Sequence, residues 1–240
     1  MKINVITKQV RKLLPLQYCG AVIVAAGNAS RMGGIDKVMA PLNGEPMILR
    51  TVRAFQNCDA IREIVVVTRA DLLEKLMELL AEFPKVRGVV VGGADRPASV
   101  QAGLNALSNR VRLAAIQDGA RPLITEAVID RTVRAAHSYG AAALGVPVKD
   151  TVKIVKGGVV KSTPDRSTLQ AIQTPQVFDI DLLRGALKKA KIDGTAITDD
   201  CSAVENLGMS VKIVEGDERN IKVTTPMDLQ IARLLLEEME

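Results

Sequence analysis

A turn of small residues followed by two cations is the segment of this sequence whose residue types most clearly suggest chemistry. Ala25, Ala26 and Gly27 follow a short apolar run, and Arg31 and Lys37 come soon after them. A glycine-containing turn at the end of a strand can direct backbone N–H groups at an anion, and the two cations add full positive charges. The spacing matches neither G-x-x-x-x-G-K-S/T nor G-x-G-x-x-G, the two common phosphate loops. The sequence therefore predicts a phosphate site of a different type, with an ordinary strand-to-helix turn and solvated cations as the alternative.

Two further apolar runs also end in residues that could contact a nucleotide or a metal ion. These residues are Gly93, Arg96 and Ser99 after the first run, and Asp118 and Arg121 after the second. A carboxylate such as Asp118 beside a triphosphate would suit Mg²⁺, which prefers a few carboxylates together with phosphate oxygens. The alternatives are a plain glycine turn followed by a helix cap, and an Asp118 that caps its turn or pairs with Arg121.

The remaining polar residues do not form a hydrolytic triad. The single histidine, His137, lies among alanines on an expected helix, and we expect it to be exposed. Lys222 lies in a short apolar stretch, which indicates an ammonium group that points inward, although a lone lysine more commonly reaches the surface. Thr198-Asp199-Asp200 is expected to cap a helix. Cations with one carboxylate and no evident general base suit a nucleophile that is already anionic, such as a substrate phosphate that attacks the α-phosphorus of a nucleoside triphosphate.

The composition argues against nucleic acid and membrane partners. The chain has 240 residues, a formal net charge of +5 and 2% aromatic residues. Few aromatic side chains are available to stack on bases, and no block of Lys and Arg stands out. A modest positive excess instead suits a pocket for a small polyanionic substrate. No apolar run approaches the length of a membrane span.

The cysteines and the N-terminal residues lead us to expect a cytoplasmic protein. Cys19, Cys58 and Cys201 are far apart and lack C-x-x-C spacing, so they suggest reduced thiols instead of zinc ligands or a disulfide framework. Residues 1–18 form a basic N-terminal extension without the apolar core and cleavage site of a signal peptide.

Apolar runs that alternate with helical patterns predict a doubly wound α/β domain, with a mainly parallel sheet, over residues 19–240. The strand candidates are Ala21–Ala25, Ile64–Thr68, Val89–Val91, Leu113–Gln117, Ala142–Val146 and Val211–Val214. The helix candidates are Met47–Asn57, Asp71–Glu82, Ala98–Leu107, Glu126–Ser138, Leu182–Lys191, Asp199–Leu207 and a last helix from Thr225. Ligands bind such sheets at the carboxyl ends of the strands, so the loops after Ala25, Val91 and Gln117 are expected to meet.

The alternating pattern breaks over about residues 148–175, which we expect to form an inserted β arm. Gly157-Gly158 between two valine-rich runs is a hairpin signal. A hairpin alone is marginally stable in water, so this one is expected to pack on something, with a second subunit as one candidate.

The motifs, taken together in their order along the chain, resemble those of a known family. They are Ala25-Ala26-Gly27, Ser30-Arg31-Met32-Gly33 with Lys37, Gly92-Gly93 with Arg96 and Ser99-Val100, Asp118-Gly119-Ala120-Arg121-Pro122, Asp150-Thr151, Gln173-Thr174-Pro175-Gln176, Thr198-Asp199-Asp200 and Asn220-Ile221-Lys222-Val223-Thr224. Over about residues 20 to 237 the chain resembles the 2-C-methyl-D-erythritol 4-phosphate cytidylyltransferase family of the non-mevalonate isoprenoid pathway.

The resemblance implies a fold, a reaction and an assembly. The fold would be Rossmann-like, of the nucleotidyltransferase type, with a mainly parallel twisted sheet flanked by helices and an inserted β arm. The reaction would join CTP and methylerythritol phosphate to give the CDP-alcohol and pyrophosphate, with Mg²⁺ as cofactor. The assembly would be a homodimer formed through the arm.

The resemblance also implies roles for residues at the motif positions. Ala25, Ala26, Gly27, Gly93 and Ser99 would hold the cytosine and ribose, and Arg96 would complete the CTP site. Arg31 and Lys37 would bind the triphosphate and stabilise the pentacoordinate phosphorus. Asp118 would lie beside the metal and ribose, with Arg121 supporting its loop. Thr151 and Arg166 of the arm, acting in the partner subunit, would grip the sugar phosphate together with Lys222.

Two departures from the family pattern concern one loop. Asp36 precedes Lys37 where the family usually has proline, and the segment between Arg31 and Lys37 is one residue short. Asp36 would place a carboxylate near the triphosphate.

Two other functions are compatible with these motifs. A ribitol-5-phosphate cytidylyltransferase would share the nucleotide half of the site, and a catalytically weak CTP-binding module would share part of it. The intact cations and Asp118 argue against the weak module, because a simple binder has no need of charges on both sides of one phosphorus.

Overall fold

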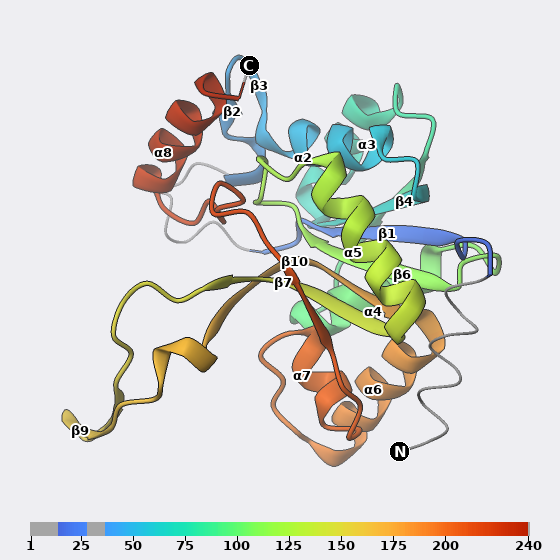
Figure 1. Ribbon diagram of the computed structural model, residues 1–240. Coiled ribbons are helices and arrows are strands. Elements are labelled where there is room, and N and C mark those ends of the chain that lie inside the picture. The colour runs from blue at the N-terminus through green and yellow to red at the C-terminus, as the bar shows by residue number, and fades with distance from the viewer. Residues whose placement is uncertain (1–13, 28–36, 240) are drawn as a thin grey trace.

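The computed structural model describes residues 14–27 and 37–239, and in this part of the chain seven strands form the main sheet (Figure 1). Their order across the sheet is β11-β7-β10-β6-β1-β4-β5. The strands are β1 (Cys19–Val24), β4 (Ile61–Thr68), β5 (Val86–Val91), β6 (Leu113–Asp118), β7 (Ala141–Pro147), β10 (Gln170–Asp179) and β11 (Lys212–Glu215). All neighbouring pairs are parallel except those of β10, which is antiparallel to both β6 and β7. The predicted mainly parallel α/β sheet is therefore confirmed.

Helices cover both faces of this sheet, which explains why its central strands are apolar throughout. One face packs against α2 (Met47–Asn57), α3 (Leu73–Leu80) and α5 (Glu126–Tyr139), and the other against α4 (Arg96–Ala106), α6 (Ile180–Asp193) and α7 (Asp200–Glu205). Successive strand residues serve the two cores alternately. On β4, Val66 belongs to the first core, whereas Val65 and Val67 belong to the second.

A smaller third core joins the last helix to a short hairpin. Helix α8 (Pro226–Glu237) packs on β2 (Pro41–Leu42), which pairs with β3 (Glu45–Pro46) in the hairpin. The 3₁₀ helix η1 (Lys37–Met39) leads into this hairpin. Thr225 caps α8, and its hydroxyl accepts a hydrogen bond from the backbone N–H of Asp228. The helix start predicted at Thr225 is confirmed.

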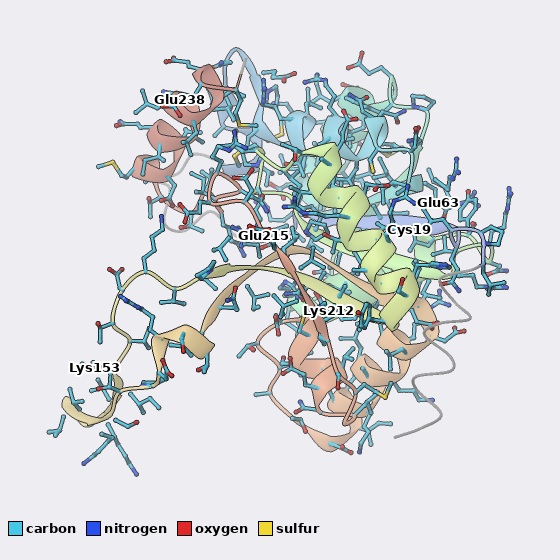
Figure 2. All side chains as sticks on the ribbon, viewed as in Figure 1. Cys19, Glu63, Lys153, Lys212, Glu215 and Glu238 are labelled. Carbon is cyan, nitrogen blue, oxygen red and sulfur yellow. The ribbon has the colours of Figure 1, made fainter. Side chains whose placement is uncertain are left out.

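The arm leaves the sheet after β7 and extends away from the body of the molecule (Figure 1). Its hairpin pairs β8 (Ile154–Lys156) with β9 (Val159–Ser162), and Gly157 and Gly158 have φ angles of 59° and 76°. The 3₁₀ helix η3 (Arg166–Thr168) follows the hairpin. Figure 2 shows Lys153 on this arm, well outside the sheet that carries Cys19. Glycine suits positions 157 and 158 of the hairpin turn because residues with a side chain rarely adopt positive φ angles.

The arm is shorter than the sequence suggests. Gln170 pairs with Pro147 and Gln173 with Leu144, so the residues from 170 onward belong to the main sheet as β10. The segment outside the sheet is therefore 148–169 and not 148–175. The first three residues of β10 are exposed, like those of the arm strands β8 and β9.

His137 is buried in the structure, so its predicted exposure is wrong. It lies one helical turn after Val133 on α5, on the side of that helix that packs against the sheet. Its Nδ1 lies 3.4 Å from Oε1 of Gln17. A separate finding concerns membranes: none of the described helices is both long and apolar enough to span one.

Candidate active site

A pocket of about 420 Å³ opens at the carboxyl ends of β1, β4, β5 and β6. Its walls come from the strand-end loops and from the segment before α8: Val24, Ala25, Ala26, Gly27, Val38, Thr68, Arg69, Ala70, Val91, Gly92, Gly93, Ala94, Asp95, Arg96, Ser99, Asp118, Ala120 and Lys222. The sheet order reverses beside β1, since the chain goes from β1 to β4 and β5 and returns to β6 on the other side. Ligands of open α/β sheets bind at such a reversal. The predicted meeting of the three loops is confirmed.

Backbone hydrogen bonds fix the relative positions of these loops. Val24 and Asp118 are paired in the register of β1 and β6, so the loops after both strands start side by side. The backbone N–H of Ala25 donates to the carbonyl of Val67 at 2.7 Å, and that of Gly119 donates to the carbonyl of Val24 at 2.8 Å. The pocket is therefore built on the rigid edge of the sheet.

The loop after β5 approaches the loop after β1 so closely that Gly92 has no room for a side chain. A Cβ atom at this position would lie 2.6 Å from Cβ of Ala26 and 2.7 Å from Oγ of Ser99. Ser99 is 3% exposed, and its hydroxyl accepts from the backbone N–H of Gly93 and donates to the carbonyl of Asp95. The contact brings three of the predicted nucleotide-binding residues, Ala26, Gly93 and Ser99, into one wall of the pocket.

Asp118 ends β6 and lies among cationic side chains at the base of the pocket. The Nζ atom of Lys222 is 2.7 Å from its Oδ2 atom, and the Nε atoms of Arg96 and Arg121 lie 3.8 Å from its carboxylate oxygens. Burial alone would raise the pKa of Asp118, but the charges of Lys222 and Arg96 outweigh it and hold the pKa below its usual range. Asp118 is therefore ionised at neutral pH. Lys222 points to the pocket as expected, although its side chain is still 41% exposed.

Arg121 lies behind this cluster and does not line the pocket. Its Nη1 atom donates to the carbonyl of Asn220 at 2.6 Å, which links the loop after β6 to the segment that carries Lys222. The side chain of Asn220 is fully buried and donates to the carbonyl of Thr174, whose hydroxyl accepts from the backbone N–H of Asp118. These bonds between distant segments place Asp118 and Lys222 relative to each other.

Asp200 is an acidic residue near the pocket. The sequence assigned it only to the start of a helix. Its neighbour Asp199 is the residue that caps α7, as predicted. The carboxylate of Asp200 instead accepts a hydrogen bond from Nη2 of Arg96 at 2.8 Å. The two residues are 104 positions apart, so no local pattern could have indicated the pair.

Two predicted site residues, Thr151 and Arg166, do not line this pocket. Thr151 and Arg166 lie exposed on the arm, and Nη1 of Arg166 donates to the carbonyl of Lys149. Arg31, Asp36 and the side chain of Lys37 lie outside the part of the chain that the structure describes.

The described residues fit a metal ion only together with a phosphate ligand. Among them, no three His, Cys, Asp or Glu side chains are grouped so that they could hold a metal. Asp118 supplies one ionised carboxylate in the pocket, and its Oδ2 atom lies 2.7 Å from Nζ of Lys222. Mg²⁺ commonly takes one or two carboxylates and completes its shell with substrate phosphates and water. The donor set therefore suits Mg²⁺ carried by a nucleotide.

Comparisons with known proteins show the family of this chain. The model of the family described as 2-C-methyl-D-erythritol 4-phosphate cytidylyltransferase (IspD) matches residues 19–238. A protein of that name from Symbiobacterium thermophilum is 47% identical over 219 residues, which cover 90% of this chain and 92% of the relative. Another from Caldanaerobacter subterraneus is 44% identical over 221 residues, which cover 90% of this chain and 97% of the relative.

A solved structure shows the same fold. The crystal structure of 4-diphosphocytidyl-2C-methyl-D-erythritol synthase from Anaerococcus prevotii matches with a TM-score of 0.84 and 30% sequence identity, over 92% of this chain and 96% of that chain. The extent of these matches and the arrangement of the pocket lead to one conclusion. This chain is a nucleotidyltransferase and belongs to the 2-C-methyl-D-erythritol 4-phosphate cytidylyltransferase family.

Proposed function

We propose that this protein transfers the cytidylyl group of CTP to 2-C-methyl-D-erythritol 4-phosphate, which gives 4-diphosphocytidyl-2-C-methyl-D-erythritol and pyrophosphate. The observation that carries the proposal is the ionised Asp118 held by Lys222 and flanked by Arg96 at the carboxyl edge of the sheet, in a chain of this family. A phosphate oxygen of the acceptor attacks the α-phosphorus of CTP, and the bond between that phosphorus and the bridging oxygen to the β-phosphorus breaks. The acceptor phosphate is already an anion, so the step needs no general base.

The wall around Gly92 is the proposed site of the cytidine. Ala25, Ala26 and Gly27 on one side and Gly93 and Ser99 on the other leave a narrow space bounded mainly by backbone. Backbone N–H and carbonyl groups at fixed positions can recognise the edge of a base by hydrogen bonds. Rigid walls of this kind also orient the α-phosphate toward the acceptor.

The cations around Asp118 are the proposed site of the phosphates. Arg96 and Lys222 line the pocket, and Arg31 and Lys37 are proposed to complete the charge around the triphosphate. Asp118 would hold Mg²⁺, which neutralises charge on the phosphate oxygens when it is bound. Fixed positive charges stabilise the additional negative charge on the equatorial oxygens of the transition state.

The arm is proposed to complete the site of a second subunit. Thr151 and Arg166 lie on a segment that projects from the body, so they are poorly placed to serve the pocket of their own chain (Figure 1). The hairpin also exposes apolar side chains, namely Val152, Ile154, Val155, Val159 and Val160. Exposed apolar patches on a protruding segment are typical of subunit contacts. A homodimer would bury them and bring Arg166 to the acceptor phosphate beside the partner's pocket.

A pyrophosphate-release assay tests the proposed reaction directly. The protein is incubated with CTP and Mg²⁺ and with either 2-C-methyl-D-erythritol 4-phosphate or ribitol 5-phosphate. Turnover with the first acceptor alone is the expected result. Turnover with ribitol 5-phosphate alone would keep the mechanism and overturn the substrate, and CTP binding without turnover would indicate a weak binding module. The cytoplasmic location of the protein stays a prediction.

A further inference from the structure

The pocket arginine Arg96 is held from behind by a buried carboxylate. Arg96 opens α4 and lines the pocket, with its Nε atom 3.8 Å from Oδ1 of Asp118. On its other side, its Nη2 atom donates to Oδ2 of Asp200 at 2.8 Å. The side chain of Asp200 is 1% exposed, whereas that of Arg96 is 29% exposed. One guanidinium group thus connects the solvent-facing pocket to an interior carboxylate.

Asp200 is itself held in place by several hydrogen bonds. Oε1 of Gln176, on β10, accepts from the backbone N–H groups of Asp200 and Cys201, and Nε2 of Gln176 donates to Oδ2 of Asp199. A capping box between Asp199 and Ser202 closes the same end of α7. The carboxylate of Asp200 therefore belongs to a rigid part of the fold, and its position does not depend on Arg96 alone.

Burial of a carboxylate such as that of Asp200 carries a free-energy cost. Desolvation opposes the charged form, so a buried ion pair often contributes little net stability compared with apolar residues of similar size. Oδ1 of Asp200 is also buried and has no hydrogen-bond partner among the described residues. An unsatisfied oxygen adds to this cost. Stabilisation of the fold is therefore a weak explanation for Asp200, and the orientation of its partner is a stronger one.

We propose that Asp200 is a positioning residue that holds the guanidinium group of Arg96 against the pocket wall, in the orientation that binds the phosphates of the nucleotide. A free arginine side chain adopts many rotamers and loses that freedom on binding a ligand. The hydrogen bond to Asp200 fixes the group beforehand, while its other face remains open to the pocket. This inference rests on the proposed function for the identity of the ligand, CTP.

The test is a double-mutant cycle on CTP affinity, measured by isothermal titration calorimetry with the full chain and Mg²⁺. Asp200→Asn keeps the shape of the side chain but removes its charge, and it is expected to raise the Kd of CTP about tenfold. In an Arg96→Ala background the same substitution is expected to change the Kd less than about twofold, because the group that it positions is gone. Asp199→Asn is the matched control. It removes a charge from the same helix end, leaves Asp200 in place, and keeps a good helix cap.

The outcomes separate positioning from a general effect on the fold. An unchanged Kd in Asp200→Asn would overturn the proposal, and so would an equal increase in both backgrounds. If Asp200→Asn does not fold, Asp200→Glu, which displaces the charge by one methylene, replaces it. The Kd of CTP is then compared between the wild-type and Arg96→Ala backgrounds in the same way. A wild-type protein that binds CTP but turns over neither acceptor refutes the proposed reaction and leaves this cycle measurable. A wild-type protein that does not bind CTP refutes both.

Discussion

At Gly92 the pocket wall leaves no space for even a methyl group. The nearest atoms to a new Cβ would be Cβ of Ala26 and Oγ of Ser99, and two hydrogen bonds hold that hydroxyl. We expect Gly92→Ala to push the two loops apart and to raise the KM for CTP about tenfold, with a smaller effect on kcat. Steady-state pyrophosphate release at varied CTP concentrations measures both constants.

Gly88, on the strand β5 that Gly92 follows, offers a matched control. A Cβ atom added there would have no neighbour within 4 Å, so Gly88→Ala should leave the KM for CTP within about twofold of the wild-type value. If Gly92→Ala also leaves the KM for CTP unchanged, the two loops can move apart without an effect on CTP binding. The space around Gly92 then does not bind the cytidine.

Lys37 is the residue for which the proposed mechanism makes the sharpest kinetic prediction. Its charge is needed most when negative charge builds up on the phosphate oxygens in the transition state. Lys37→Ala should therefore lower kcat by about a hundredfold while it changes the KM for CTP only about threefold. Single-turnover and steady-state rates measure the effect.

The charge-preserving variant Lys37→Arg serves as its control. It should recover part of the lost rate if a positive charge at this position stabilises the transition state. A normal kcat in Lys37→Ala would remove Lys37 from the mechanism.

At the scale of the elements, Glu45 of the hairpin β2–β3 forms ion pairs with Arg53 and Arg50 of α2. Arg53 donates two hydrogen bonds, of 2.6 and 2.8 Å, to the carboxylate of Glu45. The hydrogen bond from Arg53 is the main reason that the pKa of Glu45 is below its usual range. A lowered folded pKa means that the pair stabilises the fold above the unfolded pKa of about 4.3, and that this stabilisation disappears as the pH falls through the folded value.

Glu45→Gln should therefore lower the free energy of unfolding by about 1 kcal/mol at neutral pH, and the difference from wild type should disappear as the pH falls through the lowered pKa of folded Glu45. Urea denaturation over a series of pH values measures both. The control is Asp193→Asn, which breaks the exposed pair between Lys189 and Asp193 on α6 and should cost no more than about 0.5 kcal/mol. A difference for Glu45→Gln that persists at low pH would show that the ion pair is not its cause.

The sequence predicts the parallel part of this fold well, because burial on both faces leaves a local signature. Runs such as Val65–Val67 are apolar without interruption, and the parallel strand order places their carboxyl ends at one edge. The sequence alone was therefore enough to predict that the loops carrying Gly93, Asp118 and Ala25 meet in one pocket. Local capping signals also predicted the starts of α7 and α8.

The features that the sequence did not predict depend on contacts between distant segments. Strand β10 begins with three exposed residues, and its pairing with β7 is what places Gln170 in the sheet. The hydrogen bond between Arg96 and Asp200 also joins segments far apart in the chain, and no pattern on α7 reveals it. The predicted exposure of His137 was wrong because its alanine neighbours gave no sign that this face of α5 is buried.

At the scale of the whole molecule, the arm and the pocket are separate parts of one chain. The proposed dimer joins them across two chains, so each site would combine a pocket from one subunit with Arg166 from the other. A variant defective in Lys37 and a variant defective in Arg166 should therefore complement each other. Each mixed dimer would contain one complete site, formed by the pocket of the Arg166→Ala chain and the arm of the Lys37→Ala chain.

The two variants are expressed with different tags, mixed to allow subunit exchange, and assayed by pyrophosphate release. Random exchange makes about half of the dimers mixed, so the activity should reach about a quarter of the wild-type value, although each variant alone is nearly inactive. If the arm served the pocket of its own chain, each site of a mixed dimer would still carry one of the two defects. Verified mixed dimers without activity would therefore refute the shared site even if the protein is a dimer.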